Sequence, residues 1–317
     1  QTVFKNHVNN QIAEKILVDN QPINNIILTG SDLNVEVEFV EESGVKLVGK
    51  NGDLNKIEAK FEAESLLVSN NQRDINDFCI NCSQQEIKLL INEKYKNEIN
   101  IENKADVNFT KGEVDNLKLN INNNADVMLT NIKVKSATIN LSDRSELIAK
   151  GNFENMLIVA NESNVNCQKC NLGSLSLTAT DSLVKVSGEA NEFVYKGNAI
   201  EYDNILNLTK SSIKKSQLET TGESFIILDD QQDVKYALSE KTKIFIEDGV
   251  KLSQLINEMN VTRYKNIDQQ EYYKLIEKGG LDDDLLSVDG VYYHLVKTDS
   301  NKDKFEQTKH DFINLID

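Results

Sequence analysis

The stretch that decides the fold runs from about residue 97 to 197, and in it a three-residue motif occurs five times. The copies are Ala105-Asp106-Val107, Ala125-Asp126-Val127, Ser145-Glu146-Leu147, Ser163-Asn164-Val165 and Ser182-Leu183-Val184. Their central positions are 106, 126, 146, 164 and 183, so the successive intervals are 20, 20, 18 and 19. A nearly fixed period of this length is typical of a solenoid, in which each repeat packs only on its neighbours.

Apolar residues alternate with polar ones inside every repeat. The pairs that precede the motif copies are Ile99/Ile101, Leu119/Ile121, Ile139/Leu141, Leu157/Val159 and Leu175/Leu177, and the residues that follow them are Phe109, Leu129, Ala149, Cys167 and Val186. Alternation with period two indicates β-strands whose apolar residues all point inward. Helices are disfavoured because the apolar residues recur at i, i+2 and because Thr, Val, Ile and Asn are common. We therefore predict a mainly β protein, a right-handed parallel β-helix (β-solenoid) with rungs of about 20 residues.

Short polar residues mark the predicted corners between strands. Asn103, Asn123, Asp143 and Asn161 each lie three positions before the centre of a motif copy. Asn and Asp tolerate the left-handed backbone conformation that a sharp corner needs, and like side chains can stack between rungs. A structural role accounts for these residues, and ligand binding by this ladder is the lesser alternative.

The composition limits the classes of partner. The chain has 317 residues, a net charge of −16, one proline, no tryptophan and no apolar run approaching the length of a membrane-spanning helix. Its negative charge repels phosphates and anionic lipids, so we expect neither nucleic acid binding nor membrane insertion. The chain opens at Gln1, which a cleaved secretory signal or a chosen starting point would both explain. We expect an exported protein.

The chain is divided into three regions by these patterns. We predict an N-terminal cap over 1–30, a β-solenoid over 31–230 and a small α+β region over 231–317, which either caps the solenoid or binds a partner.

The C-terminal region has helical as well as strand patterns. A helix is predicted at 252–259, and a capping box of Asp268 and Glu271 predicts a second helix that ends at Gly279, with Leu275 and Ile276 buried. Val291, Tyr293 and Leu295 indicate a strand. A last short helix is predicted from Phe305, Phe312, Ile313 and Ile316.

All four cysteines lie in two Cys-x-x-Cys pairs, Cys79/Cys82 and Cys167/Cys170. Each pair could close a disulfide in an oxidising compartment, which agrees with export. Buried thiols and a shared tetrahedral zinc site are the alternatives. Cys167 occupies an inward position, which favours a local disulfide or a core thiol over zinc.

Three acidic residues occupy equivalent positions on successive rungs, namely Asp106, Asp126 and Glu146. Stacked acids repel one another unless they are solvated or share a cation. We predict no metal and no cofactor, and calcium bound by this column is the lesser alternative. Solvated turn residues are the simpler interpretation. The segment 299–303 begins like an EF-hand loop but lacks the later glycine and glutamate, and we interpret it as a polar linker.

Several segments resemble a known bacterial family. They are 28–37, Val45-Lys46-Leu47-Val48-Gly49, Asn123-Asn124-Ala125-Asp126, Val186-Ser187-Gly188-Glu189-Ala190 and Val194-Tyr195-Lys196-Gly197. Over about 26–200 the chain is similar to the putative auto-transporter adhesin head, or GIN, domain (domain of unknown function 2807). Family members usually carry Ser-Gly-Ala-Ser-Asp at the repeat, whereas here Asn largely replaces Gly. The resemblance implies an exported bacterial β-helix with a role in adhesion and no assigned enzyme chemistry.

Two functional hypotheses follow. The first is a non-enzymatic exported binding or adhesion protein for a protein or glycan ligand, with a face of candidate contacts at Asn108, Met128, Ile148, Asn166 and Lys185. Met128 and Ile148 are predicted to be exposed there. The second is a carbohydrate-active β-helix enzyme with an acidic cleft between the solenoid and the C-terminal region, which would require two or more converging carboxylates. We favour the first, since no catalytic motif is present.

Overall fold

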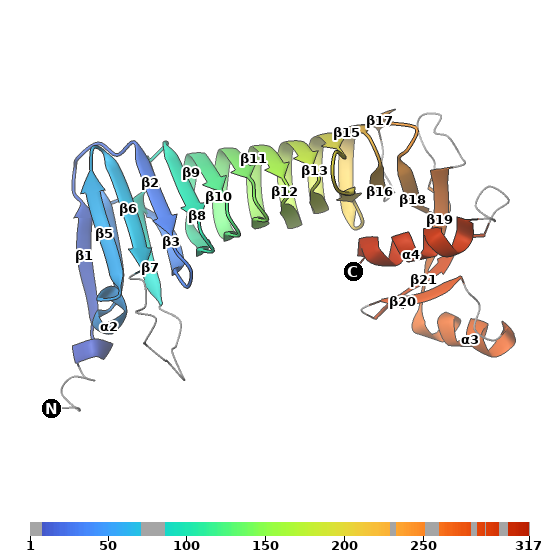
Figure 1. Cartoon of the computed structure of the whole chain (residues 1–317), viewed down its shortest axis with the longest axis horizontal. Helices are drawn as coiled ribbons and strands as arrows, with labels where there is room; N and C mark the ends of the chain where they lie inside the picture. Colours follow the sequence, from blue (N-terminus) through green and yellow to red (C-terminus); the bar gives the residue numbers. More distant parts are fainter. Residues whose placement is uncertain are drawn as a thin grey trace. The chain divides into compact units, whose positions relative to one another are not determined.

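The computed structural model describes residues 8–70, 86–228, 233–250, 260–279, 284–288, 290–297 and 304–316. The chain forms two compact units, Gln1–Ser176 and Leu177–Asp317, and their boundary falls within one strand. Strands dominate both units (Figure 1).

The described residues of the first unit form the strands β1 to β12, the last of which crosses the boundary, and include the short helix α2. They are β1 (Ile12–Val18), β2 (Asn25–Thr29), β3 (Asn34–Val40), β4 (Val45–Lys50), α2 (Asn51–Leu54), β5 (Ile57–Glu62), β6 (Ser65–Asn70), β7 (Ile87–Asn92), β8 (Glu98–Glu102), β9 (Asp106–Ile121), β10 (Asp126–Leu141), β11 (Glu146–Asn161) and β12 (Asn164–Thr180).

The long strands β9, β10 and β11 pair in parallel, each with the next. Val127 of β10 is paired with Val107 of β9 on one side and with Leu147 of β11 on the other. The rungs follow one another along the solenoid in Figure 1. Motif copies one period apart in the sequence therefore lie one above the other, as a parallel β-solenoid requires. The fold predicted from the repeat is confirmed.

The apolar core is a stack of inward side chains. Phe109, Leu129, Ala149 and Cys167 are all buried, as their positions in the repeat predict. The Phe109 ring also stacks on that of Phe39, with 5.9 Å between the ring centroids.

One predicted inward pair is wrong. Leu157 and Val159 are 44% and 42% exposed, and their neighbours Met156 and Ile158 are buried instead. The pairing offset between β10 and β11 falls by one between the pair Leu129–Ala149 and the pair Ile132–Gly151. The β11 rung is therefore one residue shorter than the β10 rung at this corner, and the turn after β11 is one residue shorter as well. Together these two differences account for the shortened interval between the third and fourth motif copies. Between these two points, the alternation of buried and exposed residues is therefore shifted by one position.

The corners have the predicted left-handed backbone at three of four positions. Asn103, Asn123 and Asp143 have φ values of 56°, 51° and 55°. Asn161 does not adopt this conformation, and Glu162 does so in its place, with φ of 46°, because that turn is one residue shorter.

Asparagine side chains form ladders along the corners and the strands. Asn123 Nδ2 donates to Asn103 Oδ1 at 2.5 Å, and Asn103 Nδ2 donates to Thr29 Oγ1 at 2.8 Å. A second ladder runs from Asn140 to Asn120 and from Asn120 to Asn100, with 3.1 Å at each step. These amides bond one another, which supports the structural role predicted for the corner ladder.

The N-terminal rungs are not stacked in chain order. β2 lies between β6 and β8 and is parallel to both, and β3 lies in the same way between β7 and β9. β4 is antiparallel to both β1 and β7. The rung formed by β2 and β3 is thus inserted between two rungs that come later in the sequence, and β2 belongs to the predicted cap segment 1–30.

In its described residues the second unit continues with strands and two helices. They are β13 (Leu183–Asn198), β14 (Asn204–Asn207), β15 (Ser211–Thr221), β16 (Ser224–Leu228), β17 (Val234–Ala237), β18 (Lys243–Glu247), β19 (Val261–Ile267), α3 (Gln269–Gly279), β20 (Leu285–Val288), β21 (Val291–Leu295) and α4 (Phe305–Ile316). Parallel pairing extends through β19, which then pairs antiparallel with β21. Phe245, Tyr264 and Phe312 are buried together in its core.

Most predictions for the C-terminal region can be compared with this unit. The carboxylate of Asp268 accepts a hydrogen bond from the Glu271 backbone at 2.7 Å, which confirms the predicted cap of α3. The predicted strand is β21 and the predicted last helix is α4. Leu275 and Ile276 are half-buried, so their predicted burial is wrong. The helix predicted at 252–259 and the segment 299–303 lie outside the described residues.

Replacing Phe109 by alanine tests the inward stack. We expect Phe109→Ala to lower the free energy of unfolding of the first unit by about 3–5 kcal/mol, because a large aromatic side chain is removed from a fully buried site. Lys118→Ala, an exposed position on the same strand, is the control and should change it by less than about 0.5 kcal/mol. Urea unfolding followed by circular dichroism measures both, and similar values would contradict the assignment of Phe109 to the core.

The left-handed corner can be tested at Asn123. Asn123→Val removes the ladder hydrogen bond and forces a β-branched residue into a left-handed conformation, which costs about 1–2 kcal/mol. Asn123→Gly removes the same hydrogen bond but adopts this backbone readily. We expect the valine variant to unfold at the lower temperature in a thermal melt. Equal losses would show that the backbone conformation is not what Asn123 supplies.

Candidate functional site

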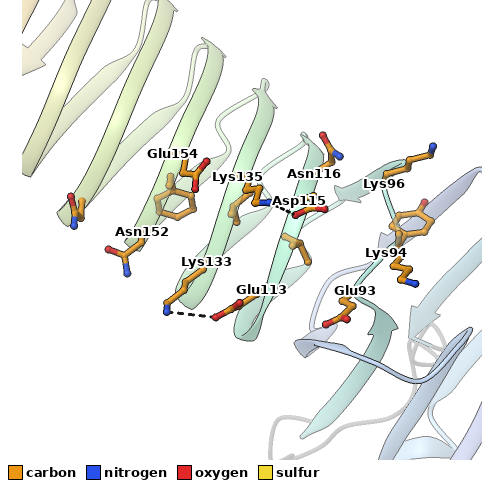
Figure 2. Close-up of a pocket in the computed structure, with 15 residues that line it drawn as sticks. Glu93, Lys94, Lys96, Glu113, Asp115, Asn116, Lys133, Lys135, Asn152 and Glu154 are labelled. Carbon is orange, nitrogen blue, oxygen red and sulfur yellow. Dashed lines mark ion pairs between the residues drawn. The ribbon is translucent and has the colours of Figure 1, made fainter.

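A charged pocket of about 720 Å³ opens on a short side of the first unit. We call it the charged pocket. It is lined by the loop between β7 and β8 and by β9, β10, β11 and β12, through Glu93, Lys94, Tyr95, Lys96, Glu113, Val114, Asp115, Asn116, Lys133, Val134, Lys135, Asn152, Phe153, Glu154 and Asn171 (Figure 2).

A corner in each long strand produces this side of the solenoid. In β9 and β11 the corner falls at Gly112 and Gly151, whose φ values of 134° and 126° lie in a region that side chains rarely adopt. In β10 the register partner of both glycines is Ile132. A Cβ on Gly112 would lie 2.6 Å from the Cβ of Phe39, so no larger residue fits without movement. After the corner the alternation continues, with Val114, Val134 and Phe153 buried. The residues on either side of these three in each strand point outward and form the charged wall, namely Glu113, Asp115, Lys133, Lys135, Asn152 and Glu154.

The charges on this wall alternate in sign from one rung to the next. Lys133 Nζ lies 3.5 Å from Glu113 Oε1, and Lys135 Nζ lies 3.5 Å from Asp115 Oδ1, as Figure 2 shows. The four side chains are 65–78% exposed. Exposed ion pairs contribute at most about 1 kcal/mol to stability. These groups therefore add little to the fold and are open to a ligand.

Tyr95 adds a fixed aromatic side chain to the pocket. Its hydroxyl donates to the carbonyl oxygen of Glu98 at 2.8 Å. Burial, and secondarily the charge of Glu98, raise the pKa of the Tyr95 phenol well above its ordinary value. The ring is therefore a neutral phenol at physiological pH, held in place by its own loop.

The predicted acid column is present, but on another face. Asp126 is paired with Asp106 and with Glu146, so the three carboxylates follow one another across parallel strands. Burial raises the pKa of all three, and the charge of Asp126 adds to this for its two neighbours. None of them lines the charged pocket. Within the described residues no three histidine, cysteine or acidic side chains are grouped as metal ligands would be. That this column binds no metal, with calcium as the lesser alternative, stays a prediction.

The predicted binding-face residues occupy one column rather than the whole outer surface. Asn108, Met128 and Ile148 are register partners, and Asn166 and Lys185 lie at the corresponding places in β12 and β13. All five are half-buried, so the prediction that Met128 and Ile148 are exposed is wrong. Their role in binding stays a prediction.

The second cysteine pair forms no disulfide. Cys167 and Cys170 are buried thiols. A hydrogen bond between them, together with burial, raises the pKa of the Cys167 thiol, and Cys170 Sγ donates to the carbonyl oxygen of Ala149 at 3.1 Å. The predicted disulfide is therefore wrong at this pair. Cys79 and Cys82 lie outside the described residues.

Sequence reasoning missed the charged pocket, although the sequence contains a signal for it. Glu113 and Lys133 are one period apart, and so are Asp115 and Lys135. Opposite charges separated by one rung are expected to face each other in a solenoid. The contribution of Tyr95 has no such signal, because its loop lies outside the repeat.

Comparison with known proteins agrees with the fold. The family model described as putative auto-transporter adhesin, head GIN domain, matches residues 24–203. A putative adhesin from Parabacteroides merdae is 15% identical, with a TM-score of 0.51 over 75% of this chain and 97% of that one. A putative lipid binding protein from Parabacteroides distasonis is 13% identical, with a TM-score of 0.55 over 74% and 96%. At these identities the two structures show a shared fold alone. No curated protein matches the chain.

In the described part of the chain, no helix has the length and apolar character needed to cross a membrane. The family match covers more than half of the 317 residues, includes the motif copies from Ala105 to Val184 and agrees with the observed solenoid. This chain therefore belongs to the family of the putative auto-transporter adhesin head GIN domain.

Proposed function

We propose that this chain is an exported, non-enzymatic binding module of the adhesin type, and that its charged pocket holds a glycan. The family description supports adhesion and export. The observation that carries the proposal is the pairing of Glu113 with Lys133 and of Asp115 with Lys135. The lysines of this wall offer hydrogen-bond donors to a polar ligand, and its carboxylates offer acceptors.

The remaining lining residues suit a sugar. Asn116, Asn152 and Asn171 carry amides that can donate to and accept from hydroxyl groups. Tyr95 offers a ring against which the apolar face of a sugar can pack, since aromatic side chains combine an apolar body with a polar tip. Repetition of these groups from rung to rung suits a ligand that itself repeats.

The enzyme alternative fits this pocket less well. A glycosidase needs one carboxylic acid with a raised pKa and a second carboxylate on the other side of the scissile bond. In the pocket two of the four acidic residues are in contact with lysines, and the carboxylates of the acid column, whose pKa values are raised, lie elsewhere. Binding without turnover is therefore the function we propose.

A glycan array and titration test this proposal. The purified protein is applied to an array of bacterial and host glycans, and the best-bound oligosaccharide is then titrated calorimetrically. We expect Lys135→Ala and Asn152→Ala each to weaken binding about tenfold or more, since each removes a hydrogen-bonding group from the pocket. Lys118→Ala removes an exposed lysine from another face of the same rung and should leave the affinity unchanged. Binding that is absent, or equal in all variants, would contradict the pocket assignment.

The same oligosaccharide distinguishes binding from catalysis. After prolonged incubation with the protein we expect mass spectrometry to find it intact. Cleavage that is lost in Glu113→Gln or Asp115→Asn would instead establish the enzyme alternative.

A further inference from the structure

The loop 199–203, between β13 and β14, presents two large apolar side chains to solvent. Ile200 is 75% exposed and Tyr202 is 63% exposed. Few large apolar residues in the described chain are exposed to this extent. Here two of them lie in one short loop, separated only by Glu201.

The loop is held from one side by a carboxylate. Asp181 Oδ1 accepts hydrogen bonds from the backbone N–H groups of Ile200 at 2.7 Å, Glu201 at 3.1 Å and Tyr202 at 3.2 Å. Hydrogen bonds to a charged acceptor are about twice as strong as those between neutral groups. One side chain therefore fixes three consecutive residues of the loop.

Glycine permits close contact from the other side. Gly222 has φ of 71°, and a Cβ placed on it would lie 2.3 Å from the carbonyl oxygen of Ala199. The Ala199 backbone N–H also donates to the carbonyl oxygen of Thr221 at 3.1 Å. The loop is thus fixed at its base and along its length, so its exposed side chains lose little conformational freedom when a partner binds.

The surroundings of the loop are acidic. Glu201 and Asp203 belong to it, and Glu223 lies close enough to influence Asp203. Burial, followed by the charges of Glu223 and Asp311, raises the pKa of Asp203, and Lys243 opposes this. Lys243 is itself paired with Asp311, with 3.0 Å between Nζ and Oδ2. The loop and the residues near Asp203 therefore carry an excess of negative charge.

We propose that the loop 199–203 is a docking element for a protein partner, whose apolar pocket takes Ile200 and Tyr202 and whose rim carries lysine or arginine. Tyrosine in a rigid setting is a common binding hot spot, and complementary charge at the rim steers association. This inference concerns a second surface and does not depend on the glycan proposal.

The charge and the shape of the loop select this occupant. An anionic membrane or a nucleic acid would be repelled by the acidic residues. Glycan sites are concave, whereas the charged pocket does not include this loop, and Ile200 offers a sugar no ring on which to stack. The exposed Ile200 and Tyr202, together with the acidic residues of the same loop, are complementary to an apolar pocket with a basic rim.

A random peptide library provides the test. A phage library of short random peptides is selected on the full-length protein and counter-selected on the double variant Ile200→Ser/Tyr202→Ser. We expect the enriched peptides to combine apolar residues with lysine or arginine. Failure to enrich any peptide, or enrichment of acidic or neutral ones, would overturn the proposal.

Single variants then locate the binding energy in one enriched peptide. We expect Tyr202→Ser to weaken its affinity about tenfold or more, and Asp181→Ala to weaken it about threefold to tenfold through loss of loop order. Tyr273→Ser is the matched control, a tyrosine 52% exposed on α3, and should have no effect. Thermal melts verify that each variant is folded. The proposal would be overturned if Tyr202→Ser bound the peptide with unchanged affinity. It would also be overturned if this variant lost binding to the glycan array or to anionic vesicles.

Discussion

Backbone hydrogen bonding between parallel rungs is the interaction on which the rest of the structure depends. Adjacent strands are about 4.8 Å apart, so residues one period apart in the sequence become neighbours in space. In the first unit this register places Val107, Val127 and Leu147 in one buried column and Asp106, Asp126 and Glu146 in another column beside it. The asparagine ladders and the ion pairs of the charged pocket arise from the same register.

The two proposed binding surfaces also depend on segments that interrupt the repeat. The long strands turn at a corner onto the side bearing the charged pocket, at Gly112 in β9 and at Gly151 in β11 and without a glycine in β10. The loop that carries Tyr95 interrupts the strands between β7 and β8, and the loop 199–203 lengthens the connection after β13. A regular rung must bury its inward residues and pair its backbone. An irregular segment does not have to pair its backbone with the neighbouring rungs, so its side chains can contact a ligand instead.

The repeat period predicted the solenoid and most inward residues, because spacing along the chain is conserved in the stack. It failed at Leu157 and Val159, because a shortened interval does not show at which positions the rung is two residues shorter. A deletion of one residue exchanges the inward and outward positions of the strand that follows it. The Cys-x-x-Cys spacing was misleading at Cys167 and Cys170, because it permits a disulfide although both side chains are buried as thiols. The opposite charges one period apart were available as a signal for the pocket, whereas Tyr95 was not.

The sequence by itself determined the strands, their period, the left-handed corners at Asn103 and Asn123 and the cap of α3 at Asp268, because these follow from local spacing and side-chain chemistry. Only the tertiary structure decided that the rung of β2 and β3 lies between β6–β7 and β8–β9. Only it brought Tyr95, from a loop outside the repeat, to the same pocket as Lys133 and Lys135. Strands pair through backbone groups that every residue carries, so the choice of partner depends on how the whole stack buries its apolar faces.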